Sequence, residues 1–277
     1  MQEGPRTPDA GRAAGALDPR AADVAEAERL LSQAQASGAV RLPALTTAEL
    51  WVLCGLGQVL AAEAEARWWA GLPEPDREQL TVAVLEFLAR RGLLRPDGQP
   101  QPAAADRPGG LPVSAALGMI VAARRFPTTV VVATEADGSA AGAPRMYGAG
   151  DAGGIPQAMI GEHVSGKVIG PFGPLHYFSL LSAERAGHVL ALWAARAGDG
   201  NRRERPAADR RPRSVDVYAY RDGRVSGRDR VTVSGVSDGH VMTRRRPGAD
   251  AAPGPAVRCD LVGLASQLTR MLALEQR

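Results

Sequence analysis

Three segments near the end of the chain alternate apolar and polar residues and are separated by Asp-Gly pairs. They are residues 215–220 (VDVYAY), 230–234 (RVTVS) and 240–244 (HVMTR), and the pairs are Asp222-Gly223 and Asp238-Gly239. Alternation with a period of two indicates strands buried on one face, and Asp-Gly is typical of tight hairpin turns. The pattern therefore predicts an antiparallel meander, which restricts the fold to one that contains a sheet.

The strongest strand pattern lies earlier, in residues 128–134 (TTVVVAT), which are apolar enough for a central position in the sheet. Helical patterns surround the strands at residues 23–35, 77–91, 113–126, 182–196 and 261–274. Helices come first, then mixed strands and helices, and finally the meander with a closing helix. This order predicts an α+β fold with a mixed, largely antiparallel central sheet and flanking helices.

Shifts in composition divide the chain into parts. Residues 1–22 lack periodicity and are predicted to be a disordered tail, and residues 23–98 are predicted to form a helical N-terminal part. After a linker at 99–110, residues 111–277 are predicted to form an α+β part with a mobile, arginine-rich loop at 198–213. Within the helical part, Thr46 or Thr47 followed by Glu49 has the pattern of a capping box.

The charge balance of the chain excludes few classes of function. The chain has 33 basic and 30 acidic residues, for a net charge of +3, and Lys167 is its only lysine. Many arginines fall in Pro-rich loops with acids interspersed, which favours solvated loops over a phosphate-binding surface. We expect no membrane span and a cytoplasmic location, because neither a long apolar run nor a secretion signal is visible. We expect Cys54 and Cys259 to be buried thiols rather than a disulfide.

No motif supports catalysis. Residues 148–153 match G-x-G-x-x-G, but Pro156 interrupts the start of any following helix and no acid lies about 20 residues on. Residues 235–239 match G-x-S-x-G and are interpreted as a hairpin turn, because no histidine follows His240. The four histidines have no metal-binding spacing. We therefore predict no catalytic residue, no metal and no cofactor; an enzyme would need polar groups gathered around Glu162, His163 or His176.

Unusual aromatic residues mark candidate protein-binding positions. Trp68 and Trp69 are adjacent on a predicted helix and point about 100° apart, so one is expected in the core and the other at a rim or interface. Phe172, His176 and Tyr177 lie in a Gly/Pro-framed stretch, GPFGPLHYF, which is a second candidate for an exposed recognition loop. Core packing is the competing interpretation for all of them.

A DNA-binding interpretation stands beside this one. Residues 46–98 contain helices, then a capped helix at 77–91, and then a short extended piece before Asp97-Gly98. That layout suits a winged helix with a recognition helix at 77–91, although this helix exposes Glu78 and Glu86. The alternative is therefore a winged-helix transcription regulator with an α+β sensing domain.

The stretch LTTAELWVLCGLG, followed by a helix ending LARRGLLRPDG, resembles the N-terminal part of EspG-like proteins. These are cytosolic chaperones of actinobacterial type VII (ESX) secretion. The helix ALGMIVAARRFP running into TTVVVAT, and the late meander with its closing helix, are similar in order to the rest of that family, over roughly residues 45–277. The stretch at 135–175 and the loop at 198–213 depart from the family pattern, so no binding residue is carried over.

The resemblance implies an α+β fold with a central antiparallel sheet and flanking helices. It also implies a role in which the protein shields the apolar tip of a secreted PE–PPE-type helical partner until export. The first functional prediction is thus a non-catalytic cytosolic protein-binding factor, with the type VII secretion chaperone as its most specific form.

Overall fold

The computed structural model describes residues 21–55, 58–59, 63–94, 113–135, 142–152, 155–195, 212–221, 223–236, 239–245 and 254–274. Most of the predicted tail at 1–22, the linker at 99–110 and nearly all of the predicted loop at 198–213 lie outside these residues. The loop prediction is wrong at its last residue, Arg213, which begins a strand. Its buried side chain donates from Nη2 to Oε1 of Glu135 at 3.0 Å.

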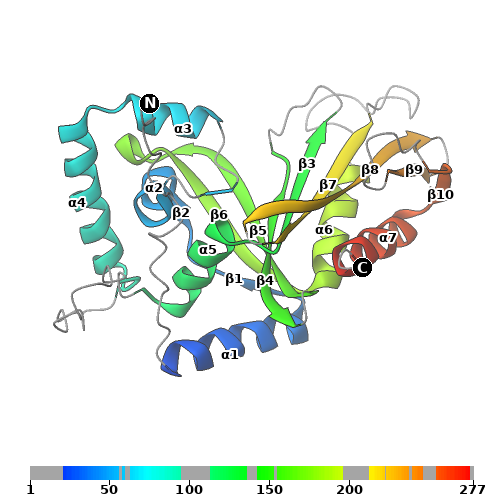
Figure 1. The fold of residues 1–277 in the computed structure, drawn as a ribbon, viewed down its shortest axis with the longest axis horizontal. Helices are drawn as coiled ribbons and strands as arrows, with labels where there is room; N and C mark the ends of the chain where they lie inside the picture. Colours follow the sequence, from blue (N-terminus) through cyan, green and yellow to red (C-terminus); the bar gives the residue numbers. More distant parts are fainter. Residues whose placement is uncertain are drawn as a thin grey trace, which may run out of the picture.

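The strands of the described residues form a single antiparallel sheet, which confirms the predicted α+β class (Figure 1). Its order is β1-β6-β5-β4-β3-β7-β8-β9-β10, and β2 also pairs with β6. The bounds are β1 Ala39–Arg41, β2 Leu45–Thr46, β3 Thr129–Glu135, β4 Arg145–Ala152, β5 Ile155–Val168, β6 Pro174–Leu181, β7 Arg213–Arg221, β8 Arg224–Val236, β9 Gly239–Arg245 and β10 Val257–Cys259.

The predicted meander is confirmed. Strands β7, β8 and β9 pair in chain order, with Arg221 opposite Arg224 at the first turn and Val236 opposite Gly239 at the second. Strand β3 lies between β4 and β7, as its apolar composition predicts. Gly148, the first glycine of the G-x-G-x-x-G match, lies inside β4 and pairs with Met159 of β5.

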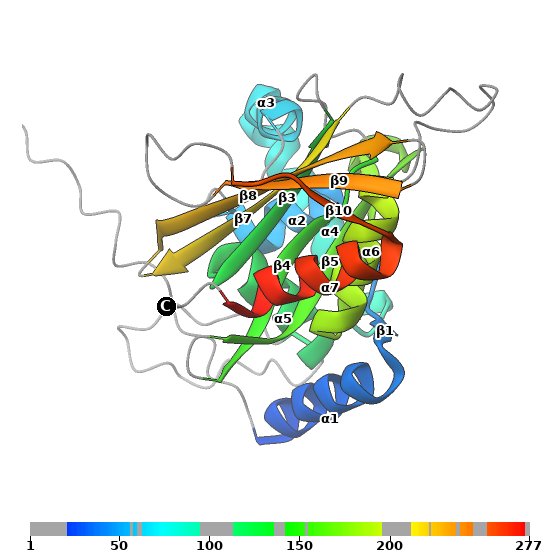
Figure 2. The same ribbon diagram turned by 90° about the vertical axis from the view of Figure 1, so that its right-hand side faces the viewer.

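The helices cover both faces of the sheet. Their bounds are α1 Ala21–Ser37, α2 Thr47–Cys54, α3 Glu63–Gly71, α4 Glu74–Arg90, α5 Ala115–Arg125, α6 Ala183–Ala195 and α7 Leu261–Leu274, with a short 3-10 helix η2 at Gly170–Phe172. One face, which carries Val130, Ile160 and Leu180, packs against the core under α1, α2 and α5; we call it the α2/α5 face. The opposite face, with Val131 and Val217, packs under α6 and α7 and is called the α6/α7 face (Figure 2). None of the described helices is long and apolar enough to span a membrane.

The N-terminal part shares the sheet with the rest of the chain, because β1 and β2 both pair with β6. The predicted capping box is confirmed at the start of α2, where Thr46 is the N-cap and accepts from the backbone N–H of Glu49. Helix α4 packs against α2 at the periphery of the molecule (Figure 1). A wing would be formed by residues 95–112, which follow α4 and lie outside the described residues. The residues that flank this segment, Leu94 and Val113, form an isolated antiparallel bridge.

The two halves of the sheet repeat one another. Four consecutive strands followed by a helix, β3–β6 with α6, correspond to β7–β10 with α7, and the halves meet where β3 pairs antiparallel with β7. In both halves the closing helix packs on the α6/α7 face. The two helices also follow a shared burial pattern, with Ala186 and Leu190 of α6 matching Leu264 and Leu268 of α7. The two halves are therefore related by a pseudo-two-fold axis that passes through the sheet between β3 and β7.

Candidate functional site

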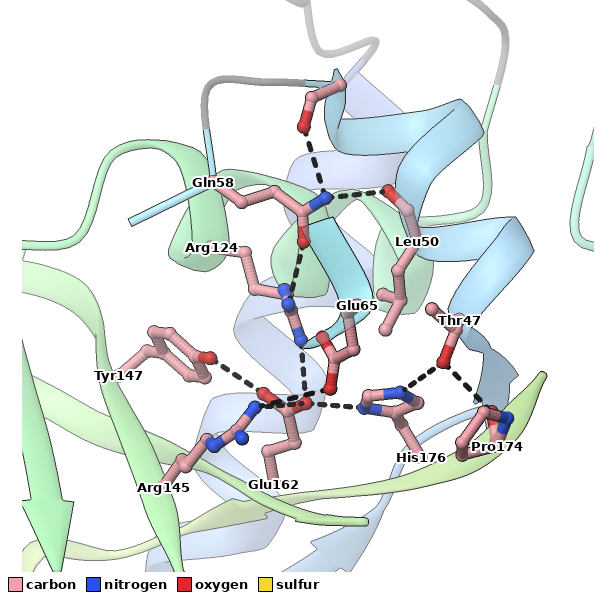
Figure 3. A network of polar contacts seen from close by, with 11 residues as sticks. Thr47, Leu50, Gln58, Glu65, Arg124, Arg145, Tyr147, Glu162, Pro174 and His176 are labelled. Atoms are coloured by element: carbon pink, nitrogen blue, oxygen red, sulfur yellow. Dashed lines mark hydrogen bonds and ion pairs between the residues drawn. The ribbon is translucent and has the colours of Figure 1, made fainter. Parts of the chain in front are cut away.

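The most concentrated polar chemistry in the described residues surrounds Glu162, in the interior under the α2/α5 face (Figure 3). Glu162 is on β5 and accepts from Nη1 of Arg124, on α5, at 2.6 Å. Its other oxygen, Oε2, accepts from the hydroxyl of Tyr147, on β4, at 2.6 Å. Nδ1 of His176, on β6, lies 2.6 Å from Oε1. Since an ionised carboxylate only accepts, Nδ1 carries the proton in this contact.

A second layer of contacts extends this cluster to the helices. Arg124 also donates from Nη2 to Oε1 of Gln58 at 2.7 Å. The other ring nitrogen of His176 lies 3.0 Å from the hydroxyl of Thr47, the first residue of α2. A guanidinium nitrogen of Arg145 lies 3.8 Å from Glu65 on α3 and 4.0 Å from Glu162. The network therefore ties α2, α3 and α5 to the three strands β4, β5 and β6.

The electrostatics fix the protonation state of the carboxylate. Burial alone raises the pKa of Glu162, but the charge of Arg124 and the hydrogen bonds from His176 and Tyr147 outweigh burial and lower it to about 2. Burial and the neighbouring Glu162 raise the pKa of Tyr147 well above its ordinary value of 10. At neutral pH the carboxylate is ionised and the phenol is protonated.

These protonation states determine whether Glu162 and Tyr147 are suited to acid–base catalysis. A general acid or base works best with a pKa near the operating pH, which neither Glu162 nor Tyr147 has. The free thiols are no better placed as nucleophiles, since burial raises the pKa of Cys54 to about 11 and, together with Asp260, raises that of Cys259. Among the described residues, no group of three or more His, Cys, Asp or Glu side chains is arranged to hold a metal ion. The Glu162 network is a buried ion cluster that links the helices to the sheet.

The stability of the cluster gives a pH prediction. A carboxylate whose folded pKa is lowered from 4.5 to about 2 stabilises the folded state above pH 4.5, and this contribution is lost as the pH falls toward 2. The shift corresponds to roughly 3 kcal/mol. We expect the difference in unfolding free energy between the wild type and Glu162→Gln to be largest above pH 5 and to shrink steadily below it. Urea titrations from pH 7 to pH 2.5 measure it, and a difference independent of pH would contradict the assignment.

The predicted tryptophans both lie at the boundary between interior and solvent. Trp68 is partly buried against the core under the α2/α5 face. Trp69 is also partly exposed and stacks on Trp51, with ring centroids 6.0 Å apart and planes 8° apart. The two adjacent rings are 6.0 Å apart and tilted by 53°. Much of each indole surface is thus used in packing within the chain.

The structure separates the three residues predicted in the GPFGPLHYF stretch. For His176 the expectation of exposure is wrong, because the strand β6 points it inward to Glu162, where it is fully buried. Tyr177, the next residue along the strand, points the other way and keeps 44% of its surface exposed. Phe172 lies in η2 and stacks on Phe87 of α4, with ring centroids 6.1 Å apart.

Two important residues were missed by the sequence interpretation. Arg124 had a usable signal: it lies one turn after Ile120 on the apolar stripe of its helix, and a buried arginine needs a carboxylate partner. Phe87 had a weaker signal, since only the position of η2 relative to α4 makes it part of an aromatic pair.

In comparisons with known proteins, no family model matches the sequence and no curated protein matches it significantly.

Proposed function

We propose that this chain is a non-catalytic, cytoplasmic protein-binding factor, and that its partner is a helical substrate of type VII secretion. The observation that carries the proposal is an aromatic pair at the surface, Phe87 on α4 with Phe172 on η2. The central antiparallel sheet with flanking helices is the architecture that the EspG-like resemblance implies, and it supports the more specific form of the proposal.

The aromatic pair is both exposed and held in position. Phe87 keeps 42% of its surface exposed, although it stacks on Phe172 and the guanidinium of Arg91 lies 5.3 Å from its ring centre. Arg91 is anchored in turn by the buried carboxylate of Glu49, at 2.7 Å, and by the backbone oxygen of Ala44. An aromatic ring held in place with an arginine beside it loses little conformational entropy on binding, and both phenylalanine and arginine are enriched at protein interfaces.

The DNA-binding alternative receives less support from α4. This helix exposes Glu74, Asp76, Glu78 and Glu86, and these carboxylates would repel the phosphates of a major groove. A recognition helix presents cationic and amide side chains there instead.

The test is a binding measurement with purified PE–PPE-type pairs, comparing wild type with Phe87→Asp. We expect at least one pair to bind and the substitution to weaken it about 30-fold, as for an aromatic hot spot. Val82→Asp is the matched control, because Val82 is 58% exposed on the same helix but on a different side, five residues from Phe87.

Two results would contradict the proposal. One is that no PE–PPE-type pair binds while duplex DNA binds at low salt, with an affinity that falls steeply as salt is raised. The other is that Phe87→Asp and Val82→Asp weaken partner binding equally, which would remove the aromatic pair from the interface.

A further inference from the structure

The pseudo-two-fold axis relates the two halves of the α2/α5 face. Helices cover this face in the first half, β3–β6, whereas it carries exposed arginines in the second half, β7–β10. In the first half, α1 and α2 contact β6 and α5 contacts β4. In the second half, the same face of β7 and β8 carries Arg228 and Arg230, whose side chains keep 46% and 40% of their surface exposed. Helices α6 and α7 contact β7–β10, but their core lies on the opposite side of the sheet (Figure 2).

The side chains on this second-half surface follow from strand alternation. Asp216 lies opposite Arg230 and Tyr218 opposite Arg228, and Arg230 in turn lies opposite Arg245 of β9. We call Asp216, Tyr218, Arg228, Arg230 and Arg245 the β7–β9 surface. Asp216 is buried and accepts from Nε and Nη2 of Arg230 at 2.7 and 2.9 Å, and from Nε of Arg228 at 3.0 Å.

The surface carries more positive than negative charge. Within the described strands, the carboxylate of Asp216 holds the guanidinium groups of Arg228 and Arg230, and the exposed Arg245 lies opposite Arg230 on the next strand. An arginine that is already oriented loses less entropy when it binds a second carboxylate, and the side chains of Arg228 and Arg230 remain 46% and 40% exposed. Charge complementarity therefore requires an anionic partner.

The geometry favours a protein partner over single-stranded nucleic acid. Nucleic acid binding on a sheet uses open aromatic rings on which bases stack. Here the guanidinium of Arg228 already lies 5.3 Å from the ring centre of Tyr218. Tyr218 and the next aromatic residue on that face of the strand, Tyr220, are also partly buried against the core under the α2/α5 face.

We propose that the β7–β9 surface binds an acidic helical segment of a partner protein, which covers the second half of the sheet as α2 and α5 cover the first. The partner's Asp or Glu side chains pair with Arg228, Arg230 and Arg245. This inference rests on the proposal that the partner is a helical protein, but it concerns a different surface from the Phe87–Phe172 pair.

The experiment uses the full chain and three fluorescein-labelled probes: a helical peptide of about 20 residues with a Glu/Leu stripe, the same peptide with Lys for Glu, and an oligo-dT strand of equal charge. Thr243→Glu adds a carboxylate to the surface, because Thr243 lies two residues before Arg245 on the same face, and it leaves both ion pairs of Asp216 intact. Val262→Glu, at a 75% exposed position on α7, is the control. If Thr243→Glu fails to fold, Arg228→Gln replaces it, since Arg230 still satisfies Asp216.

We expect the acidic peptide to bind at least about tenfold more tightly than the lysine peptide, and Thr243→Glu to weaken it about tenfold while Val262→Glu does not. Three results would each overturn the inference. They are no binding of the acidic peptide, an equal change in its affinity by Thr243→Glu and Val262→Glu, and tighter binding of oligo-dT than of the acidic peptide. If a PE–PPE-type pair binds but is insensitive to Thr243→Glu, this inference fails and the proposed function stands. If no pair binds, the proposed function fails, and the peptide measurements still decide the surface.

Discussion

Replacing Glu162 by Gln is expected to lower the unfolding free energy by about 3–5 kcal/mol, the range for removing one partner of a buried ion pair. The variant keeps the shape of the side chain but leaves the buried guanidinium of Arg124 without its counter-charge, 2.6 Å away in the wild type. It also replaces the anionic acceptor of the hydrogen bonds from Tyr147 and His176. Chemical denaturation at pH 7 measures the loss.

The matched control is Glu86→Gln. Glu86 pairs with Arg90 at 2.9 Å, but both side chains are more than half exposed, so we expect a change within about 0.5 kcal/mol. The double variant Glu162→Gln/Arg124→Met removes both charges and should cost less than the sum of the single changes. A loss below 1 kcal/mol for Glu162→Gln would show that the cluster does not hold the helices to the sheet.

Gly187→Ala is expected to destabilise the protein by about 3 kcal/mol or more, at the upper end of the cost of overpacking a core. A Cβ at Gly187 would lie 2.1 Å from Oγ1 of Thr269, 2.8 Å from the backbone nitrogen of that residue and 2.9 Å from the carbonyl oxygen of Ala265. Rotation of the threonine side chain relieves only the first contact, so the two helices must move apart. Thermal and urea denaturation measure the effect.

Gly118→Ala is the control for this substitution. Gly118 is also inside a helix, and its Cβ would meet only a methyl group of Val113 at an ordinary distance of 3.6 Å. Alanine has the higher helix propensity, so we expect this variant to be neutral or stabilised by up to about 1 kcal/mol. If both variants behave alike, close contact between α6 and α7 is not needed.

Elements with a strong local pattern were predicted correctly. The turns of the meander, the Thr46–Glu49 capping box and the closing helix at 261–274 depend on residues a few positions apart, and the structure confirms all three. Asp260 precedes that helix and accepts from the backbone N–H of Gly263 at 2.7 Å, as a side chain that caps a helix N-terminus does. In these segments the conformation that neighbouring residues favour is also the one that the fold requires, so the sequence pattern is sufficient to predict it.

The candidate site was predicted less well, because its residues come from distant segments. His176 was expected at the surface with Tyr177, yet on a strand the two must point to opposite faces, and only the covering of β6 by α2 decides which is buried. Glu162 was recognised as a polar candidate, but its partners Arg124 and Tyr147 were not.

By itself the sequence determined the α+β class, the antiparallel meander and the positions of most helices, since periodicity and turn residues act over short distances. Only the tertiary structure decided that β3 joins β7, that the two halves repeat about a pseudo-two-fold axis, and that Glu162 is an ionised, buried link between helices and sheet. Strand pairing across some 80 residues and the pKa of a buried carboxylate depend on which distant side chains are brought together. Such contacts leave no periodic trace in the chain.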